Sequence, residues 1–376
     1  MVNNKVLIMT SHQFITRFGK IADTLGNGGY SVVVLNWDKT GKRASVEDKK
    51  SYVIKNYNMK PSKSFGSFSL PVYYIFWWMY VIYYLIKNKP DVIQPENFYH
   101  YVPAIMANII LRKKIVYDIA DFFASSFQFT PRLQMFLGDL ENLTLKFADI
   151  VIIADEYRIS EINRKNVKNL LIIMNTPRDV YSVIETQETD PKKKFTIYYG
   201  GDINQTRGID EIILAIKDIK DVKLVIAGTG SDLEKYLSKF HSYSNIEYLG
   251  VIDLSESLSW TKKADIIVAF YDPKIAINRL ASPNKLFDAM MCGTAIIGNI
   301  EAKPLADRIK ENNCGYLSSY YDVGNLKKIL ESCQSNYTEM KQLGTNGRKA
   351  YLERYNWDLM EKRLLNGYYA LLQNKG

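Results

Sequence analysis

Residues 6–35 read VLIMTSHQFITRFGKIADTLGNGGYSVVVL, and this stretch decides the fold class. Its two ends, residues 6–9 and 31–35, are short apolar runs with the length and composition of buried strands. Between them, residues 14–25 place apolar side chains at helical spacing, and a glycine-rich turn ends that helix. A strand, a helix and a strand in this order form a βαβ unit, which predicts a parallel sheet with right-handed crossovers.

The same alternation continues along the rest of the chain. Further apolar runs predict strands at residues 92–93, 114–117, 150–153, 170–173, 196–199, 223–227, 246–249, 266–269 and 295–297. A polar stretch at residues 178–194 interrupts the series and has the composition of a linker. We therefore expect an α/β protein with two Rossmann-like halves, and a ligand in the cleft between them at the carboxyl ends of the strands.

Composition excludes several classes of protein. The chain has 376 residues, of which 47% are hydrophobic and 24% are charged, as in ordinary folded proteins. Its 3 Cys and 3 His exclude a disulfide framework and a four-ligand Cys/His zinc site, and they indicate a reducing compartment. The first residues do not have the pattern of a secretory signal, and the longest apolar run, residues 72–86, is shorter than the roughly 20 residues of a membrane-spanning helix.

Glycine-containing turns follow two of the predicted strands in the second half. Residues 199–208 read YGGDINQTRG, where Gly201 would let the backbone approach a ligand and Arg207 lies close to the next helix. A cation and helix N–H groups together can hold a phosphate. A glycine turn with a solvated Arg207 explains the same residues equally well. The second turn, with Gly228 in residues 226–230 (IAGTG), is a weaker signal because such turns also need glycine for steric reasons.

Residues 282–294, SPNKLFDAMMCGT, carry the strongest signal in the chain. Ser282 and Pro283 suit the N-cap and first turn of a helix, so Lys285 would be a mobile cation at the helix start. Asp288 falls inside this helix, where Asp has a poor propensity. We interpret Asp288 as the partner of a ligand hydroxyl; the alternative is a surface residue in a local ion pair.

This segment resembles the donor-binding helix of the GT-B retaining glycosyltransferases of glycosyltransferase family 4, in which an acid precedes a sequence like Ala-Met-Ala-Cys-Gly-Thr-Pro. The resemblance extends over most of the chain and includes residues 199–208 and 225–230, and Tyr355-Asn356-Trp357 before the last helix. It implies a GT-B fold, with two Rossmann-like domains facing across a cleft. The implied parts are an acceptor-binding domain, a nucleotide-sugar donor domain and a C-terminal helix packing back on the first domain, over residues 1–178, 179–355 and 356–376.

The resemblance also implies roles for single residues. The residues implied to bind the donor are Gly201, Arg207, Gly228, Asn284, Lys285 and Asp288, with Arg17 from the first half reaching the phosphates. Asp288 matches the acid that binds the donor ribose, Arg207 matches a phosphate-binding lysine, and Lys285 would be a further cation for the diphosphate. Two positions depart from the family: Asp202 stands where an arginine is usual, and Leu280 stands where a first acid contacts the donor sugar.

The first half departs from the family's catalytic pattern. Residues 118–121 (DIAD) occupy the place of an Asp-Ala-His-Glu-like motif, and Ala120 stands where the family has a histidine. Asp121 or Asp118 could contact the acceptor, although a cap on the following helix explains them equally well. His12, in the loop after the first strand, is a second candidate for acceptor contact, or a solvated histidine.

The expected chemistry needs no metal and no cofactor. The chain contains no Asp-x-Asp sequence, the metal-binding motif of the GT-A glycosyltransferases. Cations and helix N-termini would stabilise the charge that develops on the leaving diphosphate. The family retains the anomeric configuration by front-face attack, so the resemblance implies no protein nucleophile.

Residues 72–86 (VYYIFWWMYVIYYLI) predict an apolar helix with two stripes. One stripe is aliphatic apart from Phe76 and would face the core. The other would face lipid headgroups, which amphipathic aromatic side chains prefer, and it consists of Tyr73, Trp77, Tyr80 and Tyr84. A helix buried on all sides is the alternative.

The net charge of +9 lies in the first half of the chain. Residues 1–178 contain 23 Lys and Arg against 14 Asp and Glu, whereas residues 179–376 contain 26 of each kind. This excess on the acceptor half favours an anionic membrane surface as partner. Nucleic acid explains it less well, because no nucleic-acid-binding motif accompanies the charge.

We therefore expect a hexosyltransferase that moves a sugar from a UDP- or GDP-linked donor to a glycan or lipid-linked acceptor in surface polysaccharide or glycoconjugate synthesis. It would be cytoplasmic and peripheral at the inner face of the plasma membrane. The alternative is a catalytically weak or inactive sugar-nucleotide-binding subunit of a glycan assembly complex, which Leu280, Asp202 and Ala120 favour. A GT-B epimerase fits less well, because the sequence lacks the expected His and Glu clusters.

Overall fold

The computed structural model describes residues 4–11, 16–60, 70–125, 130–184 and 194–373. The chain divides into two compact units. Unit 1 comprises Met1–Asn175 with Met360–Gly376, and unit 2 comprises Thr176–Leu359. These limits lie a few residues from those expected at 178 and 355, and most of the C-terminal helix belongs to unit 1.

Unit 1 contains an eight-stranded sheet in the order β3-β4-β2-β1-β5-β6-β7-β8. The strands are β1 (Lys5–Thr10), β2 (Ser31–Asp38), β3 (Val46–Asp48), β4 (Val53–Asn58), β5 (Val92–Pro95), β6 (Lys114–Ile119), β7 (Ile150–Ile153) and β8 (Leu170–Ile172). Neighbouring strands pair in parallel, except that β3 is antiparallel to β4. At the centre, Val6 lies opposite Val32 and Val92, and all three are buried because helices cover both faces.

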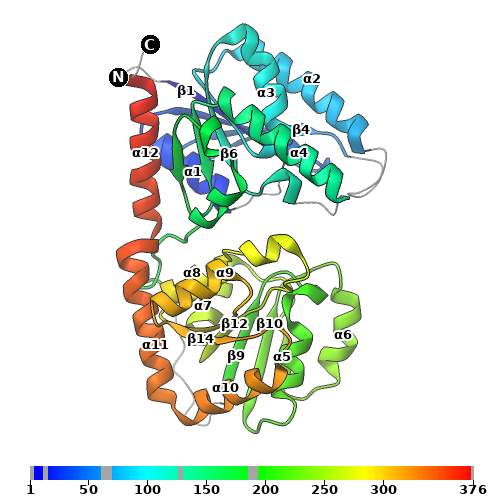
Figure 1. Ribbon diagram of the computed structural model, residues 1–376, viewed down its shortest axis with the longest axis vertical. Helices are drawn as coiled ribbons and strands as arrows, with labels where there is room; N and C mark the ends of the chain where they lie inside the picture. The colour runs from blue at the N-terminus through cyan, green and yellow to red at the C-terminus, as the bar shows by residue number, and fades with distance from the viewer. Residues whose placement is uncertain (1–3, 12–15, 61–69, 126–129, 185–193, 374–376) are drawn as a thin grey trace. The chain divides into compact units, whose positions relative to one another are not determined.

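The helices of unit 1 form two layers, one on each face of this sheet (Figure 1). They are α1 (Thr16–Asn27), α2 (Leu70–Asn88), α3 (Asn97–Leu111), α4 (Pro131–Thr144) and α12 (Trp357–Gln373). The chain steps in one direction from β4 through β5 and β6 to β7, so right-handed crossovers place α2, α3 and α4 on the same face. On the other face, α12 packs beside α1, where Thr24 donates a hydrogen bond to Glu361 at 3.0 Å.

Unit 2 contains a six-stranded sheet in the order β11-β10-β9-β12-β13-β14, and every neighbouring pair is parallel. Its strands are β9 (Phe195–Gly200), β10 (Val222–Ala227), β11 (Ile246–Tyr248), β12 (Ile266–Ala269), β13 (Ala295–Asn299) and β14 (Gly315–Ser318). Its helices are α5 (Ile209–Ile216), α6 (Leu233–His241), α7 (Leu254–Lys263), α8 (Asn284–Cys292), α9 (Lys303–Glu311), α10 (Val323–Ser335) and α11 (Tyr337–Ala350).

Each face of the unit 2 sheet is covered by helices (Figure 1). α5, α6 and α10 share one core with the strands, whereas α7 packs on the other face, where the hydroxyl groups of Tyr198 and Ser257 lie 2.9 Å apart. Two units, each with a parallel sheet between helices, confirm the expected α/β fold class.

Three strands, β3, β4 and β14, lie where no apolar run predicts them. β3 and β4 form the edge of the unit 1 sheet, and residues 53–58 alternate between buried and partly exposed side chains. An edge strand of this kind has no continuous apolar run to mark it. β14 covers residues 315–318, a segment that resembles a glycine-rich turn in the sequence.

The face of α2 that packs inward is the opposite of the predicted one. Trp77 is fully buried and stacks on Trp37 of β2, and Tyr80 stacks on Tyr57 of β4 with 4.4 Å between ring centres. The predicted contact of Tyr73, Trp77, Tyr80 and Tyr84 with lipid is therefore wrong. The physical reason is that the sheet beneath α2 presents aromatic rings, and aromatic pairs stabilise each other beyond their buried area.

The aliphatic stripe of α2 faces outward instead. The side chains of Ile75 and Met79 are more than half exposed, so the helix is also not buried on all sides. Within the described parts of the chain, none of the helices combines the length and apolarity that crossing a membrane requires.

Candidate functional site

Two glycine turns pack against each other at the carboxyl edge of the unit 2 sheet. Gly201 follows β9 with a φ of 140°, and Gly228 follows β10 with a φ of 130°. A Cβ atom on Gly228 would lie 1.9 Å from the carbonyl oxygen of Gly201, so no larger residue fits there. The contact between the two loops therefore accounts for the glycine at position 228, without a ligand.

Lys285 lies over the first of these turns. It is the second residue of α8, and a Cβ atom on Gly201 would lie 3.2 Å from its Cε atom. Its Nζ atom lies 3.6 Å from the centre of the Tyr199 ring. Burial lowers the pKa of Lys285 from 10.5 to about 7, with a further lowering by the charge of Arg207 and an opposing effect of Asp202. The structure thus holds an amine at this edge whose charged form is poorly solvated.

Arg207 is the second cation at this edge, in the 3₁₀ turn η5 (Gln205–Arg207). Its Nη1 atom donates a hydrogen bond to Oδ1 of Asn278 at 3.1 Å, and its guanidinium lies 5.0 Å from the centre of the Tyr271 ring. Its Nε atom lies 3.8 Å from Oδ2 of the half-exposed Asp202. Asp202 is thus a neighbour of both Arg207 and Lys285. One carboxylate does not neutralise two cations, so the arrangement suits a bound anion that supplies the remaining negative charge.

Asp288 and Asn284 lie on the same helix as Lys285. Asn284 begins α8 and is exposed, and Asp288 is partly buried one turn after Lys285. Burial raises the pKa of Tyr198 in β9, the hydrogen bond with Ser257 opposes this shift, and the charge of Asp288 adds to it. The structure therefore brings the predicted residues Gly201, Arg207 and Lys285 together at the end of β9, and it places Asp288 one turn further along α8.

Aromatic and amide side chains around the cations were not predicted to belong to the site. Tyr199 lies on β9, Tyr271 follows β12, and Asn278 lies in the 3₁₀ turn η6 (Ala276–Leu280). No motif spacing connects these three positions, and only the pairing of β9 with β12 brings the first two together. These residues stand close to a glycine turn or to the end of a strand, and this position in the sequence could have predicted them.

Unit 1 has a buried polar cluster at the carboxyl edge of its own sheet. Glu96 follows β5, is 1% exposed and accepts a hydrogen bond from the Thr10 hydroxyl at the end of β1. Burial raises the pKa of Glu96 to about 8; the Thr10 bond opposes this shift, and the charge of Asp118 adds to it. Glu96 is therefore mainly a neutral carboxylic acid at pH 7, which can donate a hydrogen bond as well as accept one.

Lys39 reaches this cluster from the loop after β2. Its Nζ atom donates a hydrogen bond to the Ser11 hydroxyl at 3.2 Å and lies 5.0 Å from the centre of the Trp37 ring. Burial lowers the pKa of Lys39 to about 8, against the charge of Glu96, which raises it. Neither Glu96 nor Lys39 stands in a motif, so sequence reasoning missed both.

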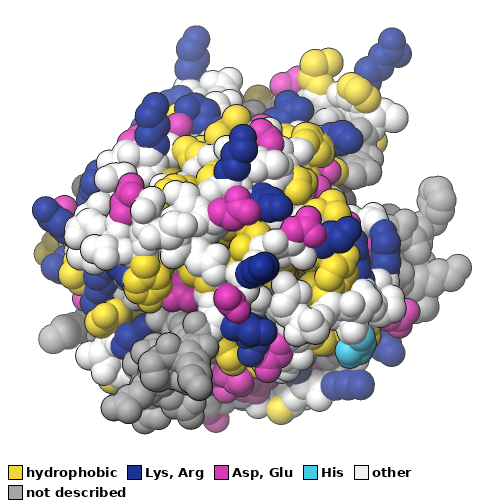
Figure 2. Space-filling model, turned by 90° about the horizontal axis from the view of Figure 1, so that it is seen from below, with side chains coloured by type: hydrophobic (Ala, Val, Ile, Leu, Met, Phe, Trp, Pro, Cys, Tyr) yellow, Lys and Arg dark blue, Asp and Glu magenta, His cyan; other side chains and the backbone are white. Residues whose placement is uncertain are grey.

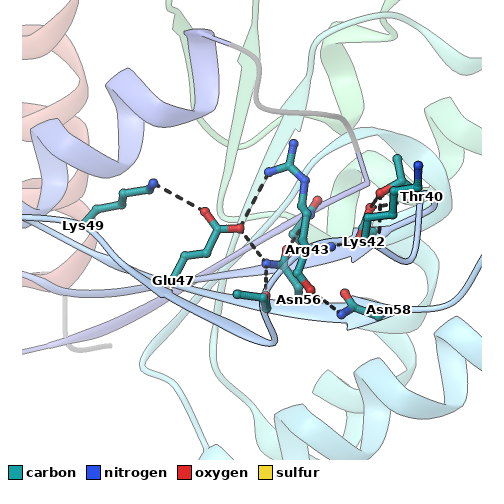
Figure 3. A network of polar contacts seen from close by, with 10 residues as sticks. Thr40, Lys42, Arg43, Glu47, Lys49, Asn56 and Asn58 are labelled. Atoms are coloured by element: carbon teal, nitrogen blue, oxygen red, sulfur yellow. Dashed lines mark hydrogen bonds and ion pairs between the residues drawn. The ribbon is translucent and has the colours of Figure 1, made fainter.

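A network of polar contacts holds the loop that carries Lys39 (Figure 3). Asp38 accepts hydrogen bonds from the backbone N–H groups of Thr40, Lys42 and Arg43 at 2.9, 2.9 and 3.0 Å. Burial alone would raise the pKa of Asp38, but a hydrogen bond from the Thr40 hydroxyl at 2.6 Å and these backbone bonds outweigh it and lower the pKa below its usual value. Further along, the side-chain amides of Asn56 and Asn58 donate hydrogen bonds to the carbonyl oxygens of Ala44 and Arg43, each at 2.7 Å, so the loop is tied to β4.

Arg17 has an internal role in unit 1. Its side chain is almost fully buried; one guanidinium nitrogen donates to the carbonyl oxygen of Ile173, and the other donates to Oδ1 of Asp118 at 2.8 Å. This buried pair joins α1 to β6 and to the residue after β8, so the arrangement does not support the predicted contact of Arg17 with donor phosphates.

The two predicted catalytic residues have different outcomes. Asp121 lies half exposed after β6, where its carboxylate pairs with Arg158 at 2.7 Å and its N–H group donates to the side chain of Asn97. His12 lies outside the described residues. Among the described residues, no group of three or more His, Cys, Asp and Glu side chains is placed to hold a metal ion.

Comparison with known proteins finds a family match within unit 2. Residues 180–350 match the family model of the glycosyl transferases group 1. No curated protein sequence matches the chain.

Three solved structures show the fold. Sucrose-phosphate synthase from Thermosynechococcus elongatus is 14% identical with a TM-score of 0.80, and the match covers 98% of this chain and 99% of that one. HepE of Anabaena, in complex with UDP-glucose, is 13% identical with a TM-score of 0.70, over 97% and 99% of the chains. A TarM variant of S. aureus is 12% identical with a TM-score of 0.68, over 97% and 99%. The chain therefore has the GT-B fold, and its residues 180–350 match the glycosyl transferases of group 1.

Proposed function

We propose that the chain is a glycosyltransferase that moves a sugar from a nucleotide-sugar donor to a glycan or lipid-linked acceptor. The observation that carries this proposal is the pair of cations, Lys285 and Arg207, at the carboxyl edge of β9 in the segment that matches the group 1 family. A diphosphate at this edge would supply the negative charge that Asp202 provides only in part.

The cations would act on the leaving group. When the bond between the sugar and the diphosphate breaks, negative charge develops on a phosphate oxygen, and Lys285 and Arg207 would stabilise it. Both are partly withdrawn from water, which strengthens their interaction with an anion. In the proposed reaction these two residues take the place of a metal ion, the anomeric configuration is retained, and no protein nucleophile is needed.

The polar cluster of unit 1 is proposed to bind the acceptor. Ligands of parallel α/β sheets bind at the carboxyl ends of the strands, where this cluster lies. The neutral carboxylic acid of Glu96 and the half-exposed carboxylate of Asp121 would contact or orient an acceptor hydroxyl. His12 stays a candidate for the same contact.

Solved proteins of this fold suggest the substrate class. HepE structures contain UDP-glucose, or UDP and glucose, and the TarM variant structure contains UDP and α-GlcNAc-glycerol. By analogy, we infer that the donor is a UDP- or GDP-linked hexose. The acceptor would belong to surface polysaccharide or glycoconjugate synthesis at the cytoplasmic face of the plasma membrane.

A weakly active or inactive donor-binding subunit is the second candidate. Asp202 places a negative charge 3.8 Å from Arg207, beside the proposed phosphate site, and Leu280 offers no carboxylate to the donor sugar. Such a subunit would bind nucleotide sugars without transferring them.

A thermal-shift screen with UDP, GDP, ADP and their sugar derivatives tests both candidates, because a ligand of the native state raises its melting temperature. The variant Arg207→Ala should lose the shift, whereas Lys328→Ala, at an exposed position of α10, should keep it. Release of nucleoside diphosphate in the presence of a membrane extract then reports transfer. Binding without transfer would favour the subunit, and the absence of both would overturn the proposal.

A further inference from the structure

The outer faces of α2, α3 and α4 carry large apolar side chains that are open to solvent. Ile109 and Ile110 near the end of α3 are 74% and 72% exposed, and Met135 and Phe136 on α4 are 66% and 62% exposed. On α2, Ile75 and its neighbours on the outward stripe are about half exposed. We call the outer surface of these three helices the apolar face.

Two helices of the apolar face, α2 and α3, pack against each other on one face of the unit 1 sheet, and α4 covers the same face of the sheet further along (Figure 1). On α4, Leu133, Phe136, Leu140 and Leu143 follow at intervals of three or four residues, so they form one outward stripe along the helix. Isolated exposed apolar residues are normal in soluble proteins, but contiguous patches mark surfaces that dock on something.

The charges around the apolar face are almost all positive. α2 and α3 contain no Asp or Glu, and α4 has one exposed acid, Asp139. Lys87, Lys89 and Arg112 are exposed where α2 and α3 end, and among the described residues none of the three forms an ion pair. By contrast, basic and acidic side chains are interspersed on the face of the molecule that Figure 2 draws.

We propose that the apolar face docks on an anionic lipid surface, with α2, α3 and α4 lying flat against it. The aliphatic, Met and Phe side chains would enter the boundary between headgroups and acyl chains, while Lys87, Lys89 and Arg112 would meet anionic headgroups. A second copy of this chain fits less well, because a self-complementary contact would bring the same cations together with one acid to balance them.

This inference goes beyond the transfer of sugar and does not depend on it. Binding to vesicles needs no donor and no acceptor, so the failure of either proposal can be distinguished from the failure of the other. It also reverses the predicted orientation of α2, because the aliphatic stripe meets the lipid and the aromatic stripe packs on the sheet.

Sedimentation with vesicles tests the proposal on the full chain. We expect the protein to pellet with vesicles of phosphatidylcholine and phosphatidylglycerol, and to bind pure phosphatidylcholine much more weakly. Ile109→Gln/Ile110→Gln should reduce binding roughly tenfold or more, because two large side chains no longer leave water. Glutamine keeps the helix propensity, and neither side chain belongs to the core.

Two matched variants complete the experiment. Lys87→Gln/Lys89→Asn/Arg112→Asn should weaken binding to the anionic vesicles and remove its dependence on salt, and asparagine suits the positive φ angles of residues 89 and 112. Leu214→Gln/Val251→Gln, at exposed apolar positions of unit 2, should bind like the wild type. Wild-type protein that stays in the supernatant would overturn the proposal. So would binding that ignores the Ile109/Ile110 change, or a lipid-free dimer that this change dissociates.

Discussion

Replacing Lys285 by methionine should stabilise the ligand-free protein and at the same time weaken its binding of nucleotide sugars. Methionine keeps an unbranched apolar chain against Tyr199 and removes the buried charge. Most substitutions of a partly buried, packed residue such as Lys285 destabilise a protein. If Lys285→Met gains stability and loses binding, the charge of Lys285 destabilises the free protein and serves to bind a ligand.

The size of the effect follows from the pKa of Lys285, which falls from 10.5 to about 7 in the folded protein. Because the folded pKa is lowered, the folded state binds fewer protons than the unfolded state between these values, and stability falls as the pH decreases from 10.5 to 7. One pKa unit corresponds to about 1.4 kcal/mol, so the penalty at pH 7 is roughly 4 kcal/mol. The cation–π contact with Tyr199 offsets about 1–2 kcal/mol of this, which leaves a gain of about 2–3 kcal/mol for Lys285→Met.

Urea denaturation at several pH values measures this gain. The advantage of Lys285→Met should be largest near pH 7 and should shrink as the pH rises toward 10.5, where the lysine is neutral in both states. The control Lys328→Met removes an exposed charge of α10 and should change the stability by less than about 0.5 kcal/mol.

Titration calorimetry with a UDP-sugar supplies the second measurement. Near pH 8 the free amine of Lys285 is mostly neutral, so binding of the diphosphate should take up close to one proton, seen as a dependence of the binding enthalpy on the buffer. Lys285→Met should show no uptake and a weaker affinity. A variant that is less stable than the wild type, or that binds the donor equally well, would refute the reasoning.

Three further substitutions test other parts of the two sites. Asp288→Ala should weaken binding of UDP roughly tenfold and leave binding of pyrophosphate unchanged in competition assays, because the family resemblance implies that this carboxylate binds the ribose. Glu96→Gln should flatten the pH dependence of stability measured by urea denaturation: the raised pKa of Glu96 makes the wild type lose stability as the pH increases from 4.5 through 8, and glutamine does not titrate. Gly228→Ala should lower the melting temperature far more than Gly250→Ala. Both glycines have a positive φ, so alanine is strained at either position, but only at residue 228 would its Cβ atom lie within 4 Å of another atom.

Much of the fold follows from local patterns in the sequence. Apolar runs such as residues 6–9 and 150–153 are buried on both faces of a sheet, so they predict strands without knowledge of their neighbours. The half-exposed edge strand at residues 53–58 has no such run and escapes prediction.

The donor side of the candidate site follows from the sequence better than the acceptor side. Gly201, Arg207 and Lys285 each stand where a strand ends or a helix begins, and these ends gather at one edge of a parallel sheet. Glu96 and Lys39 carry no such mark. They come together because β2, β1 and β5 are neighbours in the sheet, so the ends of these strands are close to one another. The hydrogen bonds of Asp38 also hold the loop that carries Lys39.

The sequence by itself determined that residues 72–86 form an apolar helix with an aromatic and an aliphatic stripe, because helical spacing is a local property of the chain. Which stripe of that helix is buried was decided only by the tertiary structure. Both stripes are apolar, so hydrophobicity does not separate them, and the aromatic rings of Trp37 and Tyr57 on the sheet select the aromatic stripe as their partner. The aliphatic stripe, which the spacing alone had assigned to the core, is left outside, and Lys87 and Lys89 are exposed at the end of the same helix.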